Sequence, residues 1–397
     1  MSKINFLEEV SPKAIGMSQE GLTRVAEIFN QQLADGLHFG AQLVVLRYGK
    51  VVLDLAAGLA NVRRKTLVTP DTPFLTWSVS KPFAGVCIHK LIEEGRIEMD
   101  TPVAEYWPEF GHGGKEKATV RHVFLHQAGI PARGFYTQVF HWPNWERVTR
   151  NVANLVAEFP PGSKTAYHTV NYGFILGEVV RRVSGVPIEN YLRQHFIDPL
   201  GLINTSLGLP ADRRATVSRL YSGDRNQIGA VTLFNLPMIR GAVLPAATLH
   251  STARELAIFY QMLLNEGRYA GKRFLQPETV RVATQLGYEG YDEVIEREMR
   301  WAYGFHLGGR YYLNQDRDGM GKGSSLDTFG HFGQRSCMAW ADRRAQLVVA
   351  FTCNRLVSKQ ANQARWIALS DAVWEAIEDY PRQKEIPSVE TMDTVIG

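Results

Sequence analysis

Cysteine is scarce in this sequence, and the spacing of the cysteines argues against both disulfide bonds and a zinc site. The 397 residues include three cysteines, Cys87, Cys337 and Cys353, which lie far apart and form no Cys-x-x-Cys pair. An odd number of scattered cysteines indicates neither a disulfide framework nor a zinc site. Because each cysteine lies in an apolar stretch, we expect all three to be small buried residues, as suits a reducing compartment.

Long apolar runs and an excess of one charge are also missing. No window of about 18 uninterrupted apolar residues is present, so we predict no membrane span and no membrane partner. The N-terminus lacks the apolar region and cleavage site of a secretory signal, which makes the cytoplasm the expected location. Lys plus Arg is 44 and Asp plus Glu is 40, a formal net charge of +4. Without a dense basic run, we predict no nucleic acid partner, and the oligomeric state stays open.

Two common enzyme signatures are absent as well. The sequence contains no Gly-x-Ser-x-Gly, which argues against an α/β-hydrolase nucleophile. It contains no His-Glu-x-x-His, the zinc-binding pattern of many metalloproteases. We therefore expect no metal and no cofactor.

The apolar patterning places strands at both ends of the chain and helices between them. Strand-like runs at 41–46 and 51–57 follow an amphipathic stretch near the N-terminus, and two more precede a last helix at 359–377. The simplest architecture is an α+β fold whose sheet is built from both termini. We predict an α/β domain from 1–85 and 241–397, a mainly helical domain at 86–240, and the active site at their seam.

One short segment has the spacing of an activated serine. Thr76–Pro82 holds the only Ser-x-x-Lys in the chain, formed by Ser78 and Lys81. On a helix these two positions share a face, and a lysine can take the serine proton if burial lowers its pKa. Chance alone gives about one such spacing in a chain of this length, so the motif by itself favours Ser78 as a helix N-cap and Lys81 as a surface cation. Ser80 would point to a different face.

The sequence around this segment resembles that of one enzyme superfamily. The stretches that carry the resemblance are FAGVCI after Lys81, LIEEGRI at 91–97, DTPV at 100–103, TVRHVFLHQAGIP at 119–131 and the GAVLPAATLHSTARELAIF run from 241. In collinear order, from about residue 15 to 380, the chain is similar to the serine β-lactamase-like superfamily, above all class C β-lactamases and family VIII carboxylesterases. The resemblance implies a β-lactamase/transpeptidase-like fold, with an antiparallel sheet flanked by terminal helices plus an all-helical domain. It also implies acyl-serine chemistry at Ser78, assisted by Lys81.

A tyrosine follows from the same resemblance. PGSKTAYHT at 161–169 matches the family's second landmark, which implies that Tyr167 exchanges a proton with Ser78. That role requires a pKa well below about 10, which a cationic Lys81 nearby would produce. The alternative is an ordinary core tyrosine with a satisfied hydroxyl. The β-lactamases have Tyr-x-Asn here, whereas this chain has Thr169 at the third position, which argues against strong penicillinase activity.

The third landmark lies late in the chain, in FGHFGQ at 329–334. His331 stands where the β-lactamases have the lysine of Lys-Thr-Gly, and the glycine is kept as Gly333. The resemblance implies that His331, Phe332 and Gly333 bind substrate, and that the backbone N–H groups of Ser78 and Gln334 form the oxyanion hole. A histidine, mostly neutral at pH 7, is a weak site for a carboxylate, which favours the esterase branch. The alternative for His331 is a polar residue at a strand end.

These residues together predict a serine carboxylesterase acting on a small-molecule, short-chain ester. The alternatives are a β-lactamase or D-alanyl-D-alanine carboxypeptidase, an acyltransferase, and a non-catalytic binding protein. An aromatic cluster after residue 131 fits either a pocket wall or the core of the helical domain; it comprises Phe135, Tyr136, Phe140, Trp142 and Trp145.

Overall fold

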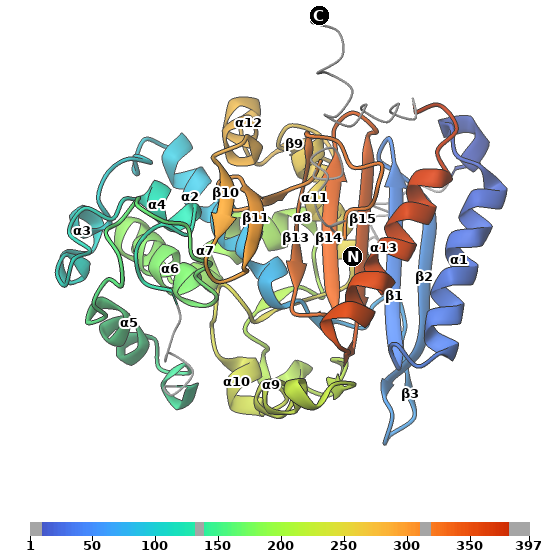
Figure 1. The fold of residues 1–397 in the computed structure, drawn as a ribbon, viewed down its shortest axis with the longest axis horizontal. Coiled ribbons are helices and arrows are strands. Elements are labelled where there is room, and N and C mark those ends of the chain that lie inside the picture. Colours follow the sequence, from blue (N-terminus) through green and yellow to red (C-terminus); the bar gives the residue numbers. More distant parts are fainter. Residues whose placement is uncertain (1–9, 132–138, 310–318, 381–397) are drawn as a thin grey trace, which may run out of the picture.

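The computed structural model describes residues 10–131, 139–309 and 319–380. Its central element is an antiparallel nine-stranded sheet with the order β10-β11-β12-β13-β14-β15-β1-β2-β3 (Figure 1). The strands from the start of the chain are β1 (Gly40–Arg47), β2 (Lys50–Asn61) and β3 (Thr66–Leu67). Those from its end are β10 (Tyr288–Asp292), β11 (Arg297–Trp301), β12 (His306–Leu307), β13 (Thr328–Gly333), β14 (Cys337–Asp342) and β15 (Leu347–Cys353).

Strand β1 joins the two ends of the chain. Val45 is paired with Val349 of β15 on one side and with Leu53 of β2 on the other. Every residue of β1 is buried, whereas most of β2 is only partly buried. A strand covered on both faces needs apolar residues at successive positions, which explains the run Leu43–Leu46.

The terminal helices α1 (Gln19–Ala34) and α13 (Lys359–Glu375) pack together over one face of the sheet (Figure 1). Helix α1 begins where the sequence predicts it, because Ser18 Oγ accepts the backbone N–H of Gly21 at 3.1 Å. Beneath the helices, Trp340 of β14 stacks on Trp374 of α13 with ring centroids 5.6 Å apart. This core holds the two ends of the chain against one sheet.

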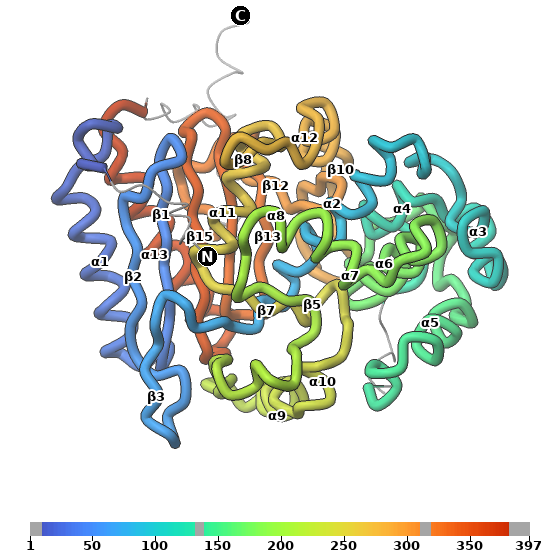
Figure 2. The backbone as a smooth tube through the Cα atoms, turned by 180° about the vertical axis from the view of Figure 1, so that it is seen from behind, coloured from blue at the N-terminus to red at the C-terminus, as the bar shows by residue number. Residues whose placement is uncertain are grey.

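The opposite face of the sheet carries α11 (Ala253–Leu264), and the helical part of the molecule lies beside it, toward the edge of the sheet that carries β10 (Figure 2). Phe259 of α11 stacks on Phe83 of α2 at 3.8 Å, and one continuous apolar core extends from the sheet into the helices. The helices in this part are α2 (Ser80–Glu93), α3 (Val103–Tyr106), α4 (Val120–Phe124), α5 (Trp145–Ala153), α6 (Asn171–Ser184), α7 (Ile188–Leu192), α8 (Asp198–Leu200), α9 (Ile228–Phe234), α10 (Pro237–Gly241) and α12 (Pro277–Thr284).

Short strand pairs tie the helical segments to the sheet. They are β4 (Phe74–Leu75), β5 (Ser206–Leu207) and β7 (Leu249–Ser251) in one small sheet, β6 (Tyr221–Ser222) with β16 (Arg355–Leu356), and β8 (Arg268–Tyr269) with β9 (Lys272–Arg273). The backbone N–H of Thr76 donates to Leu249 O at 2.9 Å, which anchors the segment just before Ser78. The small sheet thus anchors the backbone segment that leads into Ser78.

The predicted α+β class is confirmed, and so is the burial of the three cysteines, which are free thiols. Within the described ranges, none of the helices combines the length and apolarity that a membrane crossing requires. The boundaries predicted at residues 85 and 241 stay a prediction.

Candidate active site

Ser78 lies on a tight turn immediately before α2. The 3₁₀ helix η2 (Trp77–Val79) leads into α2, and Trp77 has a φ of +50°, in the left-handed region that non-glycine residues rarely adopt. The ring of Trp77 packs on Phe234 of α9 at 4.3 Å, which holds the turn in place. Ser78 is half-buried, so its hydroxyl keeps access to a substrate.

The hydroxyl of Ser80 is fully used in hydrogen bonds to the backbone. Its side chain is buried, donates a hydrogen bond to the carbonyl of Trp77, and accepts the backbone N–H of Leu249 at 3.0 Å. Of the two serines beside Lys81, only Ser78 therefore has a hydroxyl available for chemistry.

Lys81 is buried directly beside Ser78. Its Nζ lies 3.1 Å from Ser78 Oγ and donates to the carbonyl oxygens of Thr169 at 2.8 Å and Ala246 at 3.4 Å. The same atom sits over the ring of Tyr167, 4.6 Å from the centroid. The i and i+3 spacing has thus placed the amine and the hydroxyl within hydrogen-bond distance, as the motif predicts.

The electrostatic setting of Lys81 favours an uncharged amine. Burial lowers the pKa of Lys81 well below its usual value, because a desolvated ammonium is disfavoured. Among the residues that the structure describes, no carboxylate forms an ion pair with it. A neutral amine has a lone pair that can accept the proton of Ser78.

Tyr167 faces Lys81 from the loop before α6. Its ring stacks on Trp301 of β11, with centroids 5.6 Å apart and planes 11° apart. Its backbone N–H donates to Asp292 Oδ1 at 3.1 Å. The third member of the predicted catalytic set therefore lies beside Lys81 in space, although 86 residues (167 minus 81) separate the two in the sequence.

Two further histidines, which were not predicted as site residues, line this part of the site. His126 packs edge-on against Tyr167 at 4.6 Å, and its Nδ1 accepts the backbone N–H of His168 at 3.2 Å. Burial lowers the pKa of His168 to about 4 and that of His126 well below its usual value. A neutral His126 whose Nδ1 is an acceptor carries its proton on Nε2.

Strand β13 approaches the serine turn so closely that only glycine fits. A Cβ built on Gly333 would lie less than 3.0 Å from Cys337 Sγ and from Thr76 O, a separation that real Cβ atoms essentially never show. Glycine in a strand often marks such a close approach of two backbones. Gly333 therefore lets β13 lie directly against the turn before Ser78, and the place of the Gln334 backbone N–H in the oxyanion hole stays a prediction.

His331 points from β13 toward the same cluster. Its ring centroid lies 6.4 Å from that of Tyr167 and 6.2 Å from that of Trp301. Burial lowers the pKa of His331 to about 3, so the imidazole is neutral around pH 7. The position that holds a lysine in the β-lactamases therefore bears no positive charge here.

Phe332 faces the other way. Successive side chains of a strand alternate between its faces, and Phe332 stacks on Trp366 of α13 with ring centroids 5.1 Å apart. The structure thus brings His331 to the cluster and turns the side chain of Phe332 away from it. The predicted contact of Phe332 with substrate stays a prediction that rests on its backbone alone.

The rim beside the predicted oxyanion hole is neutral. The side-chain amide of Gln334 donates to Gln227 Oε1 at 2.9 Å. The neighbouring Arg335 is held in an ion pair with Asp224 at 2.8 Å. The cation closest in sequence to the third landmark is thus already neutralised.

The Tyr-x-Asn position also differs in space. Thr169 contributes its carbonyl oxygen to Lys81, and Asn171 directs its Nδ2 to the carbonyl of Ile130 at 2.9 Å. Only the Nδ2 of Asn171 is hydrogen-bonded, while its buried Oδ1 has no hydrogen-bond partner among the described residues, and Lys81 donates to backbone oxygens in place of a side-chain amide.

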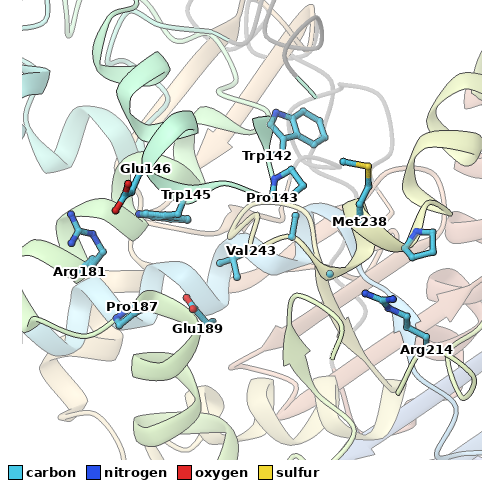
Figure 3. A pocket seen from close by; sticks show the side chains of 13 residues that line it. Trp142, Pro143, Trp145, Glu146, Arg181, Pro187, Glu189, Arg214, Met238 and Val243 are labelled. Carbon is cyan, nitrogen blue, oxygen red and sulfur yellow. The ribbon is translucent and has the colours of Figure 1, made fainter. Parts of the chain in front are cut away.

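A separate cavity of about 530 Å³ opens in the helical part (Figure 3). Trp142 and Trp145 line it, together with Glu146, Glu189 and Arg214. Both tryptophans belong to the predicted aromatic cluster, whereas Phe135 and Tyr136 lie outside the described residues. Ser78, Lys81, Tyr167 and His331 are not among its lining residues, so this cavity is distinct from the cluster around Ser78.

Comparison with known proteins shows which family the chain resembles. The family model described as Beta-lactamase matches residues 25–373. The esterase/β-lactamase LipL of Mycobacterium tuberculosis is 29% identical over 350 residues, which cover 80% of this chain and 78% of LipL. A putative D-alanyl-D-alanine carboxypeptidase of Escherichia coli is 23% identical over 390 residues, covering 89% and 87% of the two chains.

Two solved structures superpose over nearly their whole length. A penicillin-binding protein homologue from Caulobacter crescentus has a TM-score of 0.77 and 30% identity, covering 91% of this chain and 99% of its own. A family VIII carboxylesterase has a TM-score of 0.79 and 28% identity with the same coverage. These matches confirm the β-lactamase/transpeptidase-like fold, and the chain therefore belongs to the Beta-lactamase family of serine hydrolases.

Proposed function

We propose that this protein is a serine carboxylesterase that hydrolyses small, uncharged esters through an acyl-Ser78 intermediate. The observation that carries the proposal is the buried Lys81 Nζ, 3.1 Å from Ser78 Oγ and within 4.6 Å of the Tyr167 ring centroid. A hydroxyl needs an adjacent base to become a nucleophile, and this amine and phenol are the bases at hand.

In the proposed reaction, Ser78 Oγ bonds to the ester carbonyl carbon and its proton passes to Lys81, with Tyr167 as the second proton carrier. The tetrahedral oxyanion is held by the backbone N–H groups of Ser78 and Gln334. The bond to the leaving alkoxide then breaks, and the stored proton converts the alkoxide to an alcohol. Water attacks the acyl-Ser78 ester by the same route, which releases the acid and restores the serine.

The preference for esters over β-lactams rests on charge. A β-lactam antibiotic carries a carboxylate, and a neutral His331 gives that group no ionic partner. Gln334 is paired with Gln227 and Arg335 with Asp224, so the rim adds no free cation at this point of the described structure. The relative named as a family VIII carboxylesterase supports an ester substrate, whereas the name of LipL includes both esterase and β-lactamase and favours neither.

The decisive experiment compares p-nitrophenyl butyrate with a chromogenic cephalosporin, for the wild type and Ser78→Ala. We expect ester turnover that disappears in Ser78→Ala, with little cephalosporin turnover. Ser163→Ala, which removes an exposed hydroxyl from a turn, is the matched control and should hydrolyse the ester at the wild-type rate.

Each other result has a definite meaning. Dominant cephalosporin turnover would make the protein a β-lactamase and overturn the charge argument. Failure of Ser78 to react with a serine-directed phosphonate would indicate a non-catalytic binding protein. Labelling of Ser78 without hydrolysis, but with acyl transfer to an added alcohol, would indicate an acyltransferase.

A further inference from the structure

The hairpin formed by β10 and β11 is in contact with Tyr167 at two levels, backbone and ring. Thr165 and Asp292 form a parallel bridge, and the backbone N–H of Glu293 donates to Thr165 O at 2.9 Å. Two residues later along the loop, Tyr167 donates its own N–H to Asp292 Oδ1. The loop that carries Tyr167 is therefore fastened to a hairpin more than 120 residues away in the sequence.

Asp292 is an unusual choice for a purely structural position, since it is a buried carboxylate. Its Oδ1 accepts three backbone N–H groups: those of Tyr167 at 3.1 Å, Val294 at 2.9 Å and Ile295 at 3.0 Å. Its side chain is completely buried, and burial raises its pKa while these N–H groups oppose the rise. A buried charge is costly unless it is hydrogen-bonded, and here one oxygen atom joins the turn of the hairpin to Tyr167.

Trp301, at the end of β11, fixes the plane of the Tyr167 ring. The two rings are nearly parallel, 11° apart, and Trp301 also packs edge-on against His126 at 4.8 Å. Trp301 is paired in register with His306, and His306 with Gly330 of β13, the residue before His331. Its indole therefore spans the space between the tyrosine on the helical side and the histidine on the sheet.

From these contacts we propose that Asp292 and Trp301 are positioning residues, which hold the backbone and the ring of Tyr167 in register with Ser78. This inference rests on the proposed function, because Tyr167 needs positioning only if it takes part in the proton transfer. A displacement of about 1 Å in a catalytic group can cost up to about 100-fold in rate.

The test separates positioning from simple stability by using conservative partners. Asp292→Ala removes the acceptor, whereas Asp292→Asn keeps an oxygen that can accept the same three N–H groups. Trp301→Ala removes the stacking surface, whereas Trp301→Phe keeps a flat aromatic ring. Glu298→Gln is the matched control. It neutralises a carboxylate on the same hairpin, at a position that is paired with Tyr291 of β10.

Two rates are measured for each variant: labelling of Ser78 by a fluorophosphonate, and kcat with KM for p-nitrophenyl butyrate. We expect Asp292→Ala and Trp301→Ala to lower the labelling rate and kcat by about 10- to 100-fold, with KM nearly unchanged. Asp292→Asn and Trp301→Phe should recover most of that loss, and Glu298→Gln should match the wild type. Thermal unfolding of every variant identifies any that has lost its fold; the two conservative variants keep the test valid if an alanine variant is unfolded.

The proposal is overturned if the alanine variants keep wild-type labelling and kcat, or if the conservative variants, properly folded, do no better than alanine. A wild type that reacts with the phosphonate but does not hydrolyse the butyrate would refute the ester substrate alone, and the labelling rates would still decide the role of the hairpin. A wild type whose Ser78 is never labelled would refute both.

Discussion

At the scale of single residues, the environment of Lys81 determines how the site depends on pH. The amine has no carboxylate partner in the described structure, and burial lowers its pKa. Only the unprotonated amine can accept the proton of Ser78. We therefore expect kcat/KM to fall as the pH falls through the lowered pKa, and to reach its plateau well below the ordinary lysine pKa of about 10.4. A pH-rate profile in which the rise coincides with an ordinary lysine would contradict this account.

Substitution of Lys81 tests the same point. Lys81→Met should lower kcat/KM by about 10²- to 10⁴-fold, the usual contribution of a general base. Lys81→Arg should not restore the rate, because a guanidinium stays protonated and its planar fork does not fit the three oxygens around Nζ. Lys90→Met, on the same helix, removes a lysine that pairs with Glu93 away from the cluster and should leave the rate unchanged.

A second prediction concerns how His331 affects the pH dependence of the free energy of unfolding. Its pKa of about 3 in the folded state lies below the usual 6.5, so the unfolded chain binds more protons between these two values. The free energy of unfolding should therefore rise with pH across that window, by up to on the order of 1 kcal/mol per pH unit from this residue. His331→Gln should flatten that slope in denaturant titrations from pH 4 to 6.5, and an unchanged slope would show that His331 is not buried in its neutral form.

The site residues that could be predicted from sequence were those that lie within recognisable sequence motifs. Ser78 and Lys81 share a local spacing, and Tyr167 and His331 occur in short motifs. Asp292 could not be found in this way, because its partner Tyr167 is 125 residues distant and nothing local marks the contact. A buried aspartate that serves a remote loop looks the same in sequence as a solvated one.

At the scale of elements, the contact between β13 and η2 is the one that brings the two halves of the site together. A methyl group on Gly333 would overlap both Cys337 and Thr76, so β13 would have to move away from the serine turn. We expect Gly333→Ala to lower kcat by about 10²- to 10³-fold, as the loss of one oxyanion donor does elsewhere. Overpacking should also lower the free energy of unfolding by about 1–3 kcal/mol.

The control for this substitution is Gly229→Ala, in α9. No heavy atom lies within 4 Å of a Cβ at Gly229, and alanine is the better helix former. This variant should be at least as stable as the wild type and fully active. If Gly333→Ala retained wild-type kcat, the oxyanion hole would have to lie elsewhere.

Helical periodicity was the most informative signal for the elements. The last helix, predicted at 359–377, agrees with α13 to within two residues, and the amphipathic stretch near the N-terminus forms α1. Strands β10 to β12 were not predicted, because each has at most five residues and the short hairpin of β10 and β11 carries no long apolar run.

At the scale of the whole molecule, the sheet and the helical part share one apolar core. Val44 of β1 and Ala350 of β15 belong to the same buried cluster as Phe83 of α2 and Phe174 of α6. The sheet is also the floor of the second cluster, which α1 and α13 cover. Sequence patterning indicated strands at both ends of the chain, but it could not show that the core continues across the seam.

A continuous core predicts that the chain unfolds as one cooperative unit. Leu369 of α13 is completely buried on the face of the sheet opposite the helical part, so Leu369→Ala should lower the free energy of unfolding by about 2–5 kcal/mol. If the chain unfolds as one unit, the free energy of opening measured by amide hydrogen exchange should fall by the same amount in α6, at the far side of the molecule, as in α1. Gln360→Ala, at an exposed position of α13, should change neither by more than about 0.5 kcal/mol. Loss of protection confined to α1 and α13 would instead mean that the helical part folds independently, and that the seam carrying the site can open without global unfolding.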